Sequence, residues 1–229
     1  LLPLTNKIPK CLVPINNVPL IKYWFALFSQ YGINEVIINT HYLAEEVNKY
    51  LAKNDFGLEI IIEYEPELLG SLGSLLRYLP HFIDEESFLT CYADNLTNLD
   101  LDKFILFHKS HKYPVTMGLF HCIDPTKCGI PTLNNKNVVT EFVEKPRNPK
   151  SNLANAGIYI FDKEIFDKIK FNQIGQLDIG NDLIPILVGK IKAAIIDDYI
   201  IDIGSKEDYI KANDYVSLNP NDFNHIPST

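Results

Sequence analysis

Phe88-Leu-Thr-Cys-Tyr92-Ala-Asp94-Asn95 is the stretch that decides the fold, because an apolar strand runs here directly into polar residues. The segment 88–92 predicts a buried strand. Asp94 lies at its carboxyl end, and open α/β sheets bind their ligands at the carboxyl ends of their strands. A carboxylate in this place suits Mg²⁺, which takes one or two carboxylates together with phosphate oxygens. The alternative is an Asp that caps the next element, with Asn95 completing a turn.

Upstream of this strand, the apolar periodicity alternates between the helical and the extended pattern. The expected elements are a helix over 19–31 that ends at Gly32, a strand over 35–39, a helix over 43–51, a strand over 59–64, and a helix after the turn 69–74 that Pro80 stops. Such alternation indicates βαβ units around a mostly parallel sheet.

The second half is more mixed. The periodicity predicts strands over 115–121, 130–133, 138–143 and 157–161, and helices over 162–169, 181–188 and 206–216. No Pro/Gly/Ser-rich linker and no repeat divides the chain, so we expect one domain over 1–218. The tail 219–229 is polar and loses periodicity.

Composition excludes several function classes. With 229 residues, 46% apolar residues and no 18-residue apolar run, the sequence predicts a globular, soluble protein without a membrane span. A net charge of -8 repels the backbone of nucleic acids, although a nucleotide needs only a local group of donors and a metal ion. The four cysteines form no C-x-x-C pair, which favours reduced thiols and a cytoplasmic protein and leaves disulfides open.

The first fifteen residues, Leu1-Leu-Pro-Leu-Thr-Asn-Lys-Ile-Pro-Lys10-Cys-Leu-Val-Pro-Ile15, resemble the sugar-1-phosphate nucleotidyltransferases. In that family a glycine-rich G-G-x-G-T-R-L loop is followed by P-L-T and then by P-K-x-L-x-P. By itself, Lys10 after a proline would be a solvated loop lysine. Because the chain opens within this motif and without Met, we expect roughly 15 to 25 native residues upstream, forming one strand and an anion-binding turn.

Four further motifs follow in the order of the family. They are Leu69-Gly70-Ser71-Leu-Gly73, similar to L-G-T-A-G; Glu144-Lys145-Pro146; Asn155-Ala-Gly157-Ile-Tyr159-Ile-Phe161, similar to N-x-G-x-Y-x-F; and Asp202-Ile-Gly204-Ser205, similar to D-I-G-T. Ala93-Asp94-Asn95 stands where the family often has G-D-x. Without the resemblance, Asp202 would be read as a cap for the helix near Ser205, and Ser205 suits that N-cap role better.

The resemblance implies an α/β, Rossmann-like three-layer nucleotidyltransferase fold with a mixed, mostly parallel central sheet. It also implies the roles of individual residues. Lys10 and Lys145 would be catalytic; Leu69, Gly70, Ser71, Gly73 and Asp94 would bind the nucleotide; Asn95, Glu144, Lys145, Asn155 and Gly157 would bind the sugar phosphate; and Asp94 with Asp202 would hold Mg²⁺. Glu144 would accept hydrogen bonds from sugar hydroxyls and Lys145 would pair with the sugar phosphate.

The expected reaction joins an NTP and a sugar 1-phosphate into an NDP-sugar and pyrophosphate, as in the supply of cell-surface polysaccharides. The segment 65–69 resembles guanylyltransferases, which favours GTP with mannose or manno-heptose 1-phosphate. UTP or dTTP with a hexose or amino-sugar phosphate is the alternative. An inactive sugar-nucleotide-binding subunit is an alternative of another class. We expect no nucleic acid and no membrane as partners and keep a homodimer open.

Overall fold

A computed structural model describes residues 1–169, 175–224 and 226. These form two compact units, each assembled from separate parts of the sequence. Unit 1 comprises Leu1–Glu67, Ala93–Leu101 and Asp198–Thr229, and unit 2 comprises Leu68–Tyr92 and Asp102–Asp197. The chain passes from one unit to the other several times, so no single linker separates them in the sequence. A sequence without a linker is therefore compatible with two units. The single domain expected over 1–218 stays a prediction.

Unit 1 begins with short 3₁₀ turns at Leu4–Asn6 and Lys10–Leu12. An antiparallel hairpin of β1 (Pro14–Ile15) and β2 (Val18–Pro19) leads into helix α1 (Leu20–Gln30), and Gly32 follows with φ +72°. Strand β3 (Glu35–Thr40) and strand β4 (Glu59–Tyr64) pair in parallel, joined through α2 (Ala44–Lys53). This is the βαβ unit that the alternating periodicity predicted.

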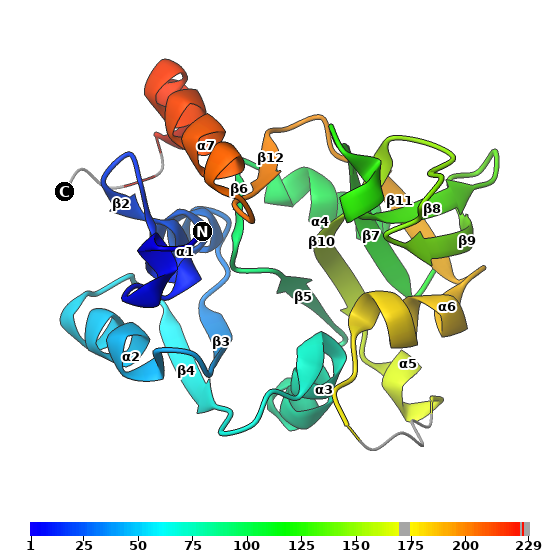
Figure 1. The fold of residues 1–229 in the computed structure, drawn as a ribbon. Coiled ribbons are helices and arrows are strands. Elements are labelled where there is room, and N and C mark those ends of the chain that lie inside the picture. Colours follow the sequence, from blue (N-terminus) through cyan, green and yellow to red (C-terminus); the bar gives the residue numbers. More distant parts are fainter. Residues whose placement is uncertain (170–174, 225, 227–229) are drawn as a thin grey trace. The chain divides into compact units, whose positions relative to one another are not determined.

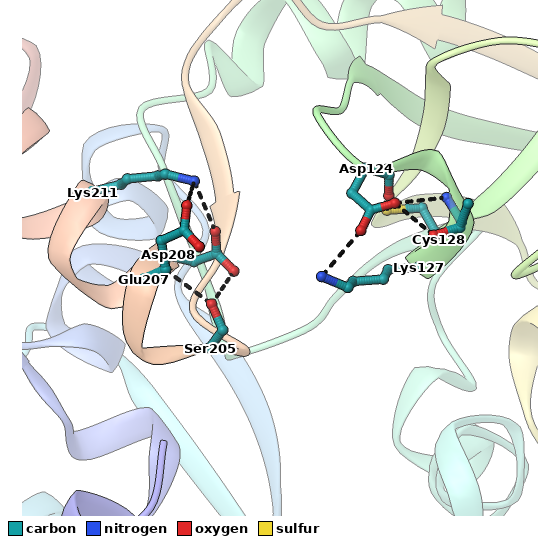
Figure 2. Close-up of polar contacts among 8 residues, drawn as sticks. Asp124, Lys127, Cys128, Ser205, Glu207, Asp208 and Lys211 are labelled. Carbon is teal, nitrogen blue, oxygen red and sulfur yellow. Dashed lines mark hydrogen bonds and ion pairs between the residues drawn. The ribbon is translucent and has the colours of Figure 1, made fainter.

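The later segments of unit 1 return to the N-terminal ones. Strand β6 (Asn95–Thr97) pairs antiparallel with β12 (Ile200–Asp202), and α7 (Lys206–Leu218) follows β12 (Figure 1). The predicted N-cap is confirmed, since Ser205 Oγ accepts the Asp208 N–H at 3.1 Å; Figure 2 shows this helix start. The core combines all three segments, with Ile15, Leu20, Leu96, Ile203 and Phe223 buried together.

Unit 2 contains a four-stranded sheet in the order β11-β7-β10-β5 (Figure 1). The strands are β5 (Ser87–Cys91), β7 (Val115–His121), β10 (Leu153–Asp162) and β11 (Ile191–Ile195). β11 runs parallel to β7, whereas β10 is antiparallel to both of its neighbours. A two-stranded sheet of β8 (Gly129–Leu133) and β9 (Val139–Glu144) is also antiparallel. The expected mixed α/β sheet is therefore present, with less parallel pairing in unit 2 than the sequence predicted.

The helices of unit 2 are mostly short. They are α3 (Gly70–Tyr78), α4 (Leu101–Lys109, whose first residue belongs to unit 1), α5 (Glu164–Asp167), a π-helical turn at Ile179–Leu183 and α6 (Ile184–Leu187). α3, the π-helical turn and α6 bury Leu72, Leu183 and Leu187 in the same core as Met117 and Tyr159 of the sheet. The core thus fixes both α3 and the segment before the π-helical turn.

Several boundaries differ from the sequence-based expectation. The helix expected over 162–169 is a single turn, α5, and the one over 181–188 begins as a π-helical turn at Ile179. In the expected polar tail, Phe223 is buried and its ring packs roughly perpendicular to the Tyr23 ring, while residues 225 and 227–229 lie outside the described residues. Burial of this apolar ring stabilises the segment although most of the surrounding residues are polar.

The helices and the cysteines bear on a membrane span and on disulfide bonds. Within the described ranges, every helix is too short or too polar to cross a membrane. All four cysteines are free thiols.

Candidate functional site

A charged cluster, defined here as Lys10, Asp94 and Asp202, lies in unit 1. Lys10 Nζ donates to Asp94 Oδ2 at 2.6 Å and to Asp202 Oδ1 at 3.0 Å. About a third of the Lys10 and Asp94 side chains and 60% of the Asp202 side chain are exposed. The three residues that the sequence placed in one site are therefore in direct contact.

The strand pairing in unit 1 explains how residues so far apart in sequence meet. In the antiparallel register of β6 and β12, Asp202 is the partner of Asn95, the residue after Asp94. The Ile203 N–H also donates to the Asp94 carbonyl at 3.2 Å. Lys10 begins the 3₁₀ turn Lys10–Leu12, directly after Pro9. Three short backbone segments thus bring the three side chains together.

The charges in this cluster influence one another. Burial by itself would lower the pKa of the Lys10 ammonium, but the charges and hydrogen bonds of Asp94 and Asp202 outweigh it and raise that pKa. The pKa of Asp202 is also raised, first by desolvation and then by the neighbouring Asp94 charge, which Lys10 only partly offsets. The Lys10 ammonium thus offsets part of the repulsion between the Asp94 and Asp202 carboxylates.

The donor set of this cluster suits a divalent cation. The Lys10 ammonium already lies within hydrogen-bond distance of both carboxylates, at the position where a cation would be attracted. Mg²⁺ prefers carboxylate oxygens and needs only one or two of them. Across the residues that the structure describes, no group of three or more His, Cys, Asp and Glu side chains forms a metal site. Asp94 and Asp202 together offer two carboxylates, a number that suits this ion.

The glycine-containing loop lies in unit 2, at the start of α3. Gly70 has φ +79°, and a Cβ there would lie 2.3 Å from the Leu177 carbonyl oxygen. That carbonyl accepts the N–H groups of Leu72 and Gly73, while the Leu177 N–H donates to the Leu69 carbonyl. The loop is thus held by backbone contact with the segment before the π-helical turn, and only glycine fits at Gly70.

Ser71 adds a side-chain link to the same segment. Its Oγ donates to Asp178 Oδ2 at 2.8 Å and accepts the Ile179 N–H at 2.9 Å. Asp178 Oδ1 in turn accepts the Asn181 N–H at 2.9 Å. Asp178 therefore contacts a predicted site residue, although no sequence motif pointed to it.

Glu144 and Lys145 lie at the end of β9, also in unit 2. Burial is the largest cause of the raised pKa of the Glu144 carboxyl; the Asp178 charge raises it further and the Lys145 charge lowers it. Lys145 Nζ is 3.9 Å from Glu144 Oε1, and its side chain is largely exposed. Lys145 adopts φ +48°, and its N–H donates to the Cys128 carbonyl.

The turn before Cys128 is itself stabilised by a side chain. Asp124 Oδ1 accepts from the Thr126 N–H and hydroxyl, and the Cys128 thiol donates to the Asp124 carbonyl at 3.7 Å (Figure 2). This turn fixes the carbonyl that holds the Lys145 backbone.

Asn155 and Gly157 lie at an irregularity of β10, where its register with β7 shifts between Asn155 and Tyr159. Asn155 Oδ1 accepts the Gly157 N–H at 3.0 Å, and Asn155 Nδ2 donates to the Tyr159 hydroxyl at 2.5 Å. Gly157 has φ +66°, and a Cβ there would lie 2.5 Å from the Tyr92 ring. The Asn155 side chain thus satisfies a backbone N–H within this irregular stretch of β10.

Asn95 differs from the other residues that were predicted to bind the sugar phosphate. It is buried in unit 1 as the first residue of β6, and its carbonyl accepts the Trp24 indole N–H at 2.8 Å. The other predicted residues of the sugar-phosphate group, Glu144, Lys145, Asn155 and Gly157, all belong to unit 2, as do Leu69, Gly70, Ser71 and Gly73.

Comparison with known proteins places this arrangement in a family. The family model of nucleotidyl transferases matches residues 1–218. The chain belongs to the nucleotidyl transferase family. This confirms the resemblance drawn from the five motifs.

Curated relatives in this family have several specificities. A UTP–glucose-1-phosphate uridylyltransferase of Synechocystis sp. is 29% identical and aligns with 92% of the chain and 58% of its own length. The mannose-1-phosphate guanylyltransferase catalytic subunit beta of Drosophila pseudoobscura pseudoobscura is 27% identical, over 91% of the chain and 57% of its own length. The chain thus spans less than two thirds of the length of these relatives.

A solved structure supports the fold. HddC from Yersinia pseudotuberculosis superimposes with a TM-score of 0.78 at 25% identity, covering 91% of this chain and 90% of HddC. HddC has also been solved complexed with GMP-PN, with a TM-score of 0.77. The α/β Rossmann-like nucleotidyltransferase fold is confirmed.

Proposed function

We propose that this chain transfers a nucleoside monophosphate from an NTP to a sugar 1-phosphate. A phosphate oxygen of the sugar 1-phosphate attacks the α-phosphorus in line, the bond from that phosphorus to the β-phosphate oxygen breaks, and pyrophosphate leaves. No covalent bond to the protein forms. The observation that carries the proposal is the contact of Lys10 with both Asp94 and Asp202.

The charged cluster suits the handling of phosphates. Negative charge moves toward the departing oxygens in nucleotidyl transfer, so a positioned ammonium stabilises that step. Lys10 would supply it. Asp94 and Asp202 would hold Mg²⁺, which when bound offsets the repulsion between the phosphate groups. Lys10 contacts the same two carboxylates, so its ammonium would lie close to phosphates that approach them.

Unit 2 suits the sugar 1-phosphate. Lys145 presents a largely exposed ammonium, which would pair with the sugar phosphate and orient its nucleophilic oxygen. The Glu144 carboxylate would accept hydrogen bonds from sugar hydroxyls, and the Asn155 amide offers both a donor and an acceptor. The loop Leu69–Gly73 would line the base and ribose of the nucleotide.

For the substrates, we favour GTP with mannose 1-phosphate or a manno-heptose 1-phosphate. The guanylyltransferase relative and the GMP-PN complex of HddC support this choice. The uridylyltransferase relative favours UTP with glucose 1-phosphate as the second candidate.

A screen of pyrophosphate release tests both the reaction and the specificity. The purified protein in its full native length is supplied with Mg²⁺, one of five NTPs and one of several sugar 1-phosphates. We expect release that requires both substrates and is largest with GTP. Tight binding of an NDP-sugar without release from any pair would instead identify a binding or regulatory subunit.

A further inference from the structure

Lys145 leaves the regular conformation of the strand that precedes it. β9 ends at Glu144, and Lys145 adopts φ +48°, in the left-handed region that favours glycine and asparagine. A lysine persists in this region only where its surroundings hold it, and such backbone strain is concentrated at functional sites. The conformation of Lys145 therefore needs a structural cause, and it has a consequence for the site.

The consequence is that two consecutive side chains lie on one side of β9. In a regular strand, successive side chains point to opposite faces. A Cβ at Gly129 would lie 2.3 Å from the Phe142 ring and 2.6 Å from Glu144 Oε2, so Phe142 and Glu144 share the face over Gly129. Regular extension would direct Lys145 to the opposite face. Instead, Lys145 Nζ lies 3.9 Å from Glu144 Oε1, so the ammonium and the carboxylate are neighbours.

The cause lies in the hydrogen bonds that end the pairing of β8 with β9. Beyond the pair of Gly129 and Glu144, the next partners in register are Cys128 and Lys145. Such partners can exchange two N–H···O bonds in an antiparallel ladder. The Lys145 N–H donates to the Cys128 carbonyl at 3.1 Å, but the Cys128 N–H is directed to the Pro125 carbonyl at 3.5 Å. The ladder therefore ends here, and the Lys145 backbone can leave the extended conformation.

The side chain of Asp124 closes the turn that takes the Cys128 N–H. Asp124 Oδ1 accepts the Thr126 N–H at 3.2 Å and the Thr126 hydroxyl at 2.6 Å, which caps the 3₁₀ turn Pro125–Lys127. The Asp124 carbonyl also accepts the Cys128 thiol at 3.7 Å (Figure 2). Without this cap, the Cys128 N–H could reach the Lys145 carbonyl and extend the ladder by one pair.

We infer that Asp124 is a positioning residue for Lys145. By capping the turn, Asp124 withholds the Cys128 N–H from the ladder and keeps Lys145 in the left-handed conformation beside Glu144. The inference rests on the proposed function, in which Lys145 pairs with the sugar phosphate and Glu144 accepts from sugar hydroxyls. A phosphate and a hydroxyl of the same sugar then meet their partners on one side of the strand, which favours ligands that carry both groups.

Steady-state kinetics test this role. Asp124→Ala removes the cap, so Lys145 should become extended and its ammonium should leave the side of Glu144. We expect the KM for sugar 1-phosphate to rise about tenfold, whereas the KM for NTP and kcat should change less than about threefold. Asp124→Asn keeps the Oδ1 acceptor and loses only the charge that faces Lys127. Its KM for sugar 1-phosphate should stay within about twofold of that of the unchanged protein.

A double-mutant cycle shows whether Asp124 acts through Lys145. The Lys145→Ala variant has no ammonium to misplace. In that background, Asp124→Ala should therefore raise the KM for sugar 1-phosphate by less than about twofold. Additive effects would mean that Asp124 influences the site by another route.

Glu141→Ala is the matched control. Glu141 lies on β9, accepts the Thr132 hydroxyl at 3.1 Å and pairs with Lys150 at 2.6 Å. It thus has the same kinds of partner as Asp124, a threonine hydroxyl and a lysine, but lies outside the turn. Its KM for sugar 1-phosphate should match that of the unchanged protein.

Urea unfolding tests the conformation of Lys145 without turnover. At φ +48° glycine is unstrained and alanine is strained, so Lys145→Gly should have an unfolding equilibrium constant about fivefold smaller than that of Lys145→Ala. In the Asp124→Ala background, where residue 145 would be extended, the order should reverse, because glycine is the less stable residue in a strand. The first pair also decides the question if Asp124→Ala does not fold.

The inference is overturned if Asp124→Ala and Asp124→Asn raise the KM equally, if the cycle is additive, or if Glu141→Ala has the same effect. It is also overturned if Lys145→Gly is less stable than Lys145→Ala while Asp124 is in place. The unfolding order separates this inference from the proposed function. The expected order and its reversal without pyrophosphate release would keep the positioning role and reject the transferase, whereas release with the opposite order would do the reverse.

Discussion

The two units carry their candidate functional residues in different ways. In unit 1 the charged cluster consists of full charges, with an ammonium in contact with two carboxylates that remain partly exposed. In unit 2, Asn155 and Ser71 are neutral, and each donates a hydrogen bond, Asn155 Nδ2 to the Tyr159 hydroxyl and Ser71 Oγ to Asp178 Oδ2. Charges act on phosphates and a metal without strict geometry, whereas a directed network can recognise uncharged hydroxyls.

The largest effect is expected when a carboxylate of the charged cluster loses its charge. Asp94→Asn or Asp202→Asn should reduce turnover at least about a hundredfold, because the proposed Mg²⁺ site would lose one of its two anionic ligands. Far-ultraviolet circular dichroism should show an intact fold. Asp214→Asn on the exposed side of α7 is the matched control and should keep turnover. Normal Mg²⁺-dependent turnover of both cluster variants would remove the cluster from the mechanism.

The next effect separates the two lysines. Lys10→Ala should chiefly lower kcat, and Lys145→Ala should chiefly raise the KM for sugar 1-phosphate. The loss of a charge-assisted contact of about 2 to 4 kcal/mol corresponds to roughly 30- to 1000-fold. Kinetics with each substrate varied in turn distinguish the two, with exposed Lys53→Ala as the control. Unchanged kinetics for Lys10→Ala would contradict its catalytic role.

A smaller effect concerns the rigidity of unit 2. Gly70→Ala should lower the free energy of unfolding by about 3 kcal/mol. The new Cβ would clash with the Leu177 carbonyl, and alanine is also strained at φ +79°. Gly189 has φ +84° with no atom within 4 Å of a Cβ, so Gly189→Ala measures the backbone strain alone, about 1 kcal/mol. Urea unfolding measures both. Equal losses would show that the Leu177 contact does not hold the loop.

The smallest effect is the pH dependence of Glu144. Its folded-state pKa is raised, first by burial, so its contribution to stability is complete below the unfolded pKa of about 4.3 and is lost as pH rises through the folded value. Glu144→Gln should therefore be more stable than the unchanged protein at pH 7, with the difference vanishing near pH 4. Thermal unfolding at both pH values tests this. A Gln variant that is less stable at pH 7 would mean that the ionised carboxylate is well compensated.

The sequence by itself determined the α/β class, the family and most candidate residues. Local periodicity predicted β4 and β7 with their observed bounds, and the motifs indicated Lys10, Asp94 and Asp202. These features depend on residues close together in the chain, where side-chain spacing follows the period of the helix or strand.

Only the tertiary structure decided how these residues meet. The pairing of β6 with β12 joins two three-residue strands from distant parts of the chain, which are too short to produce a periodic pattern. Asp178 belongs to no motif, and its place beside Ser71 follows from the backbone contact of Leu177 with the loop at Gly70. Strand register and hydrogen-bond direction are set by partners brought together through burial of the core, and local sequence does not encode them.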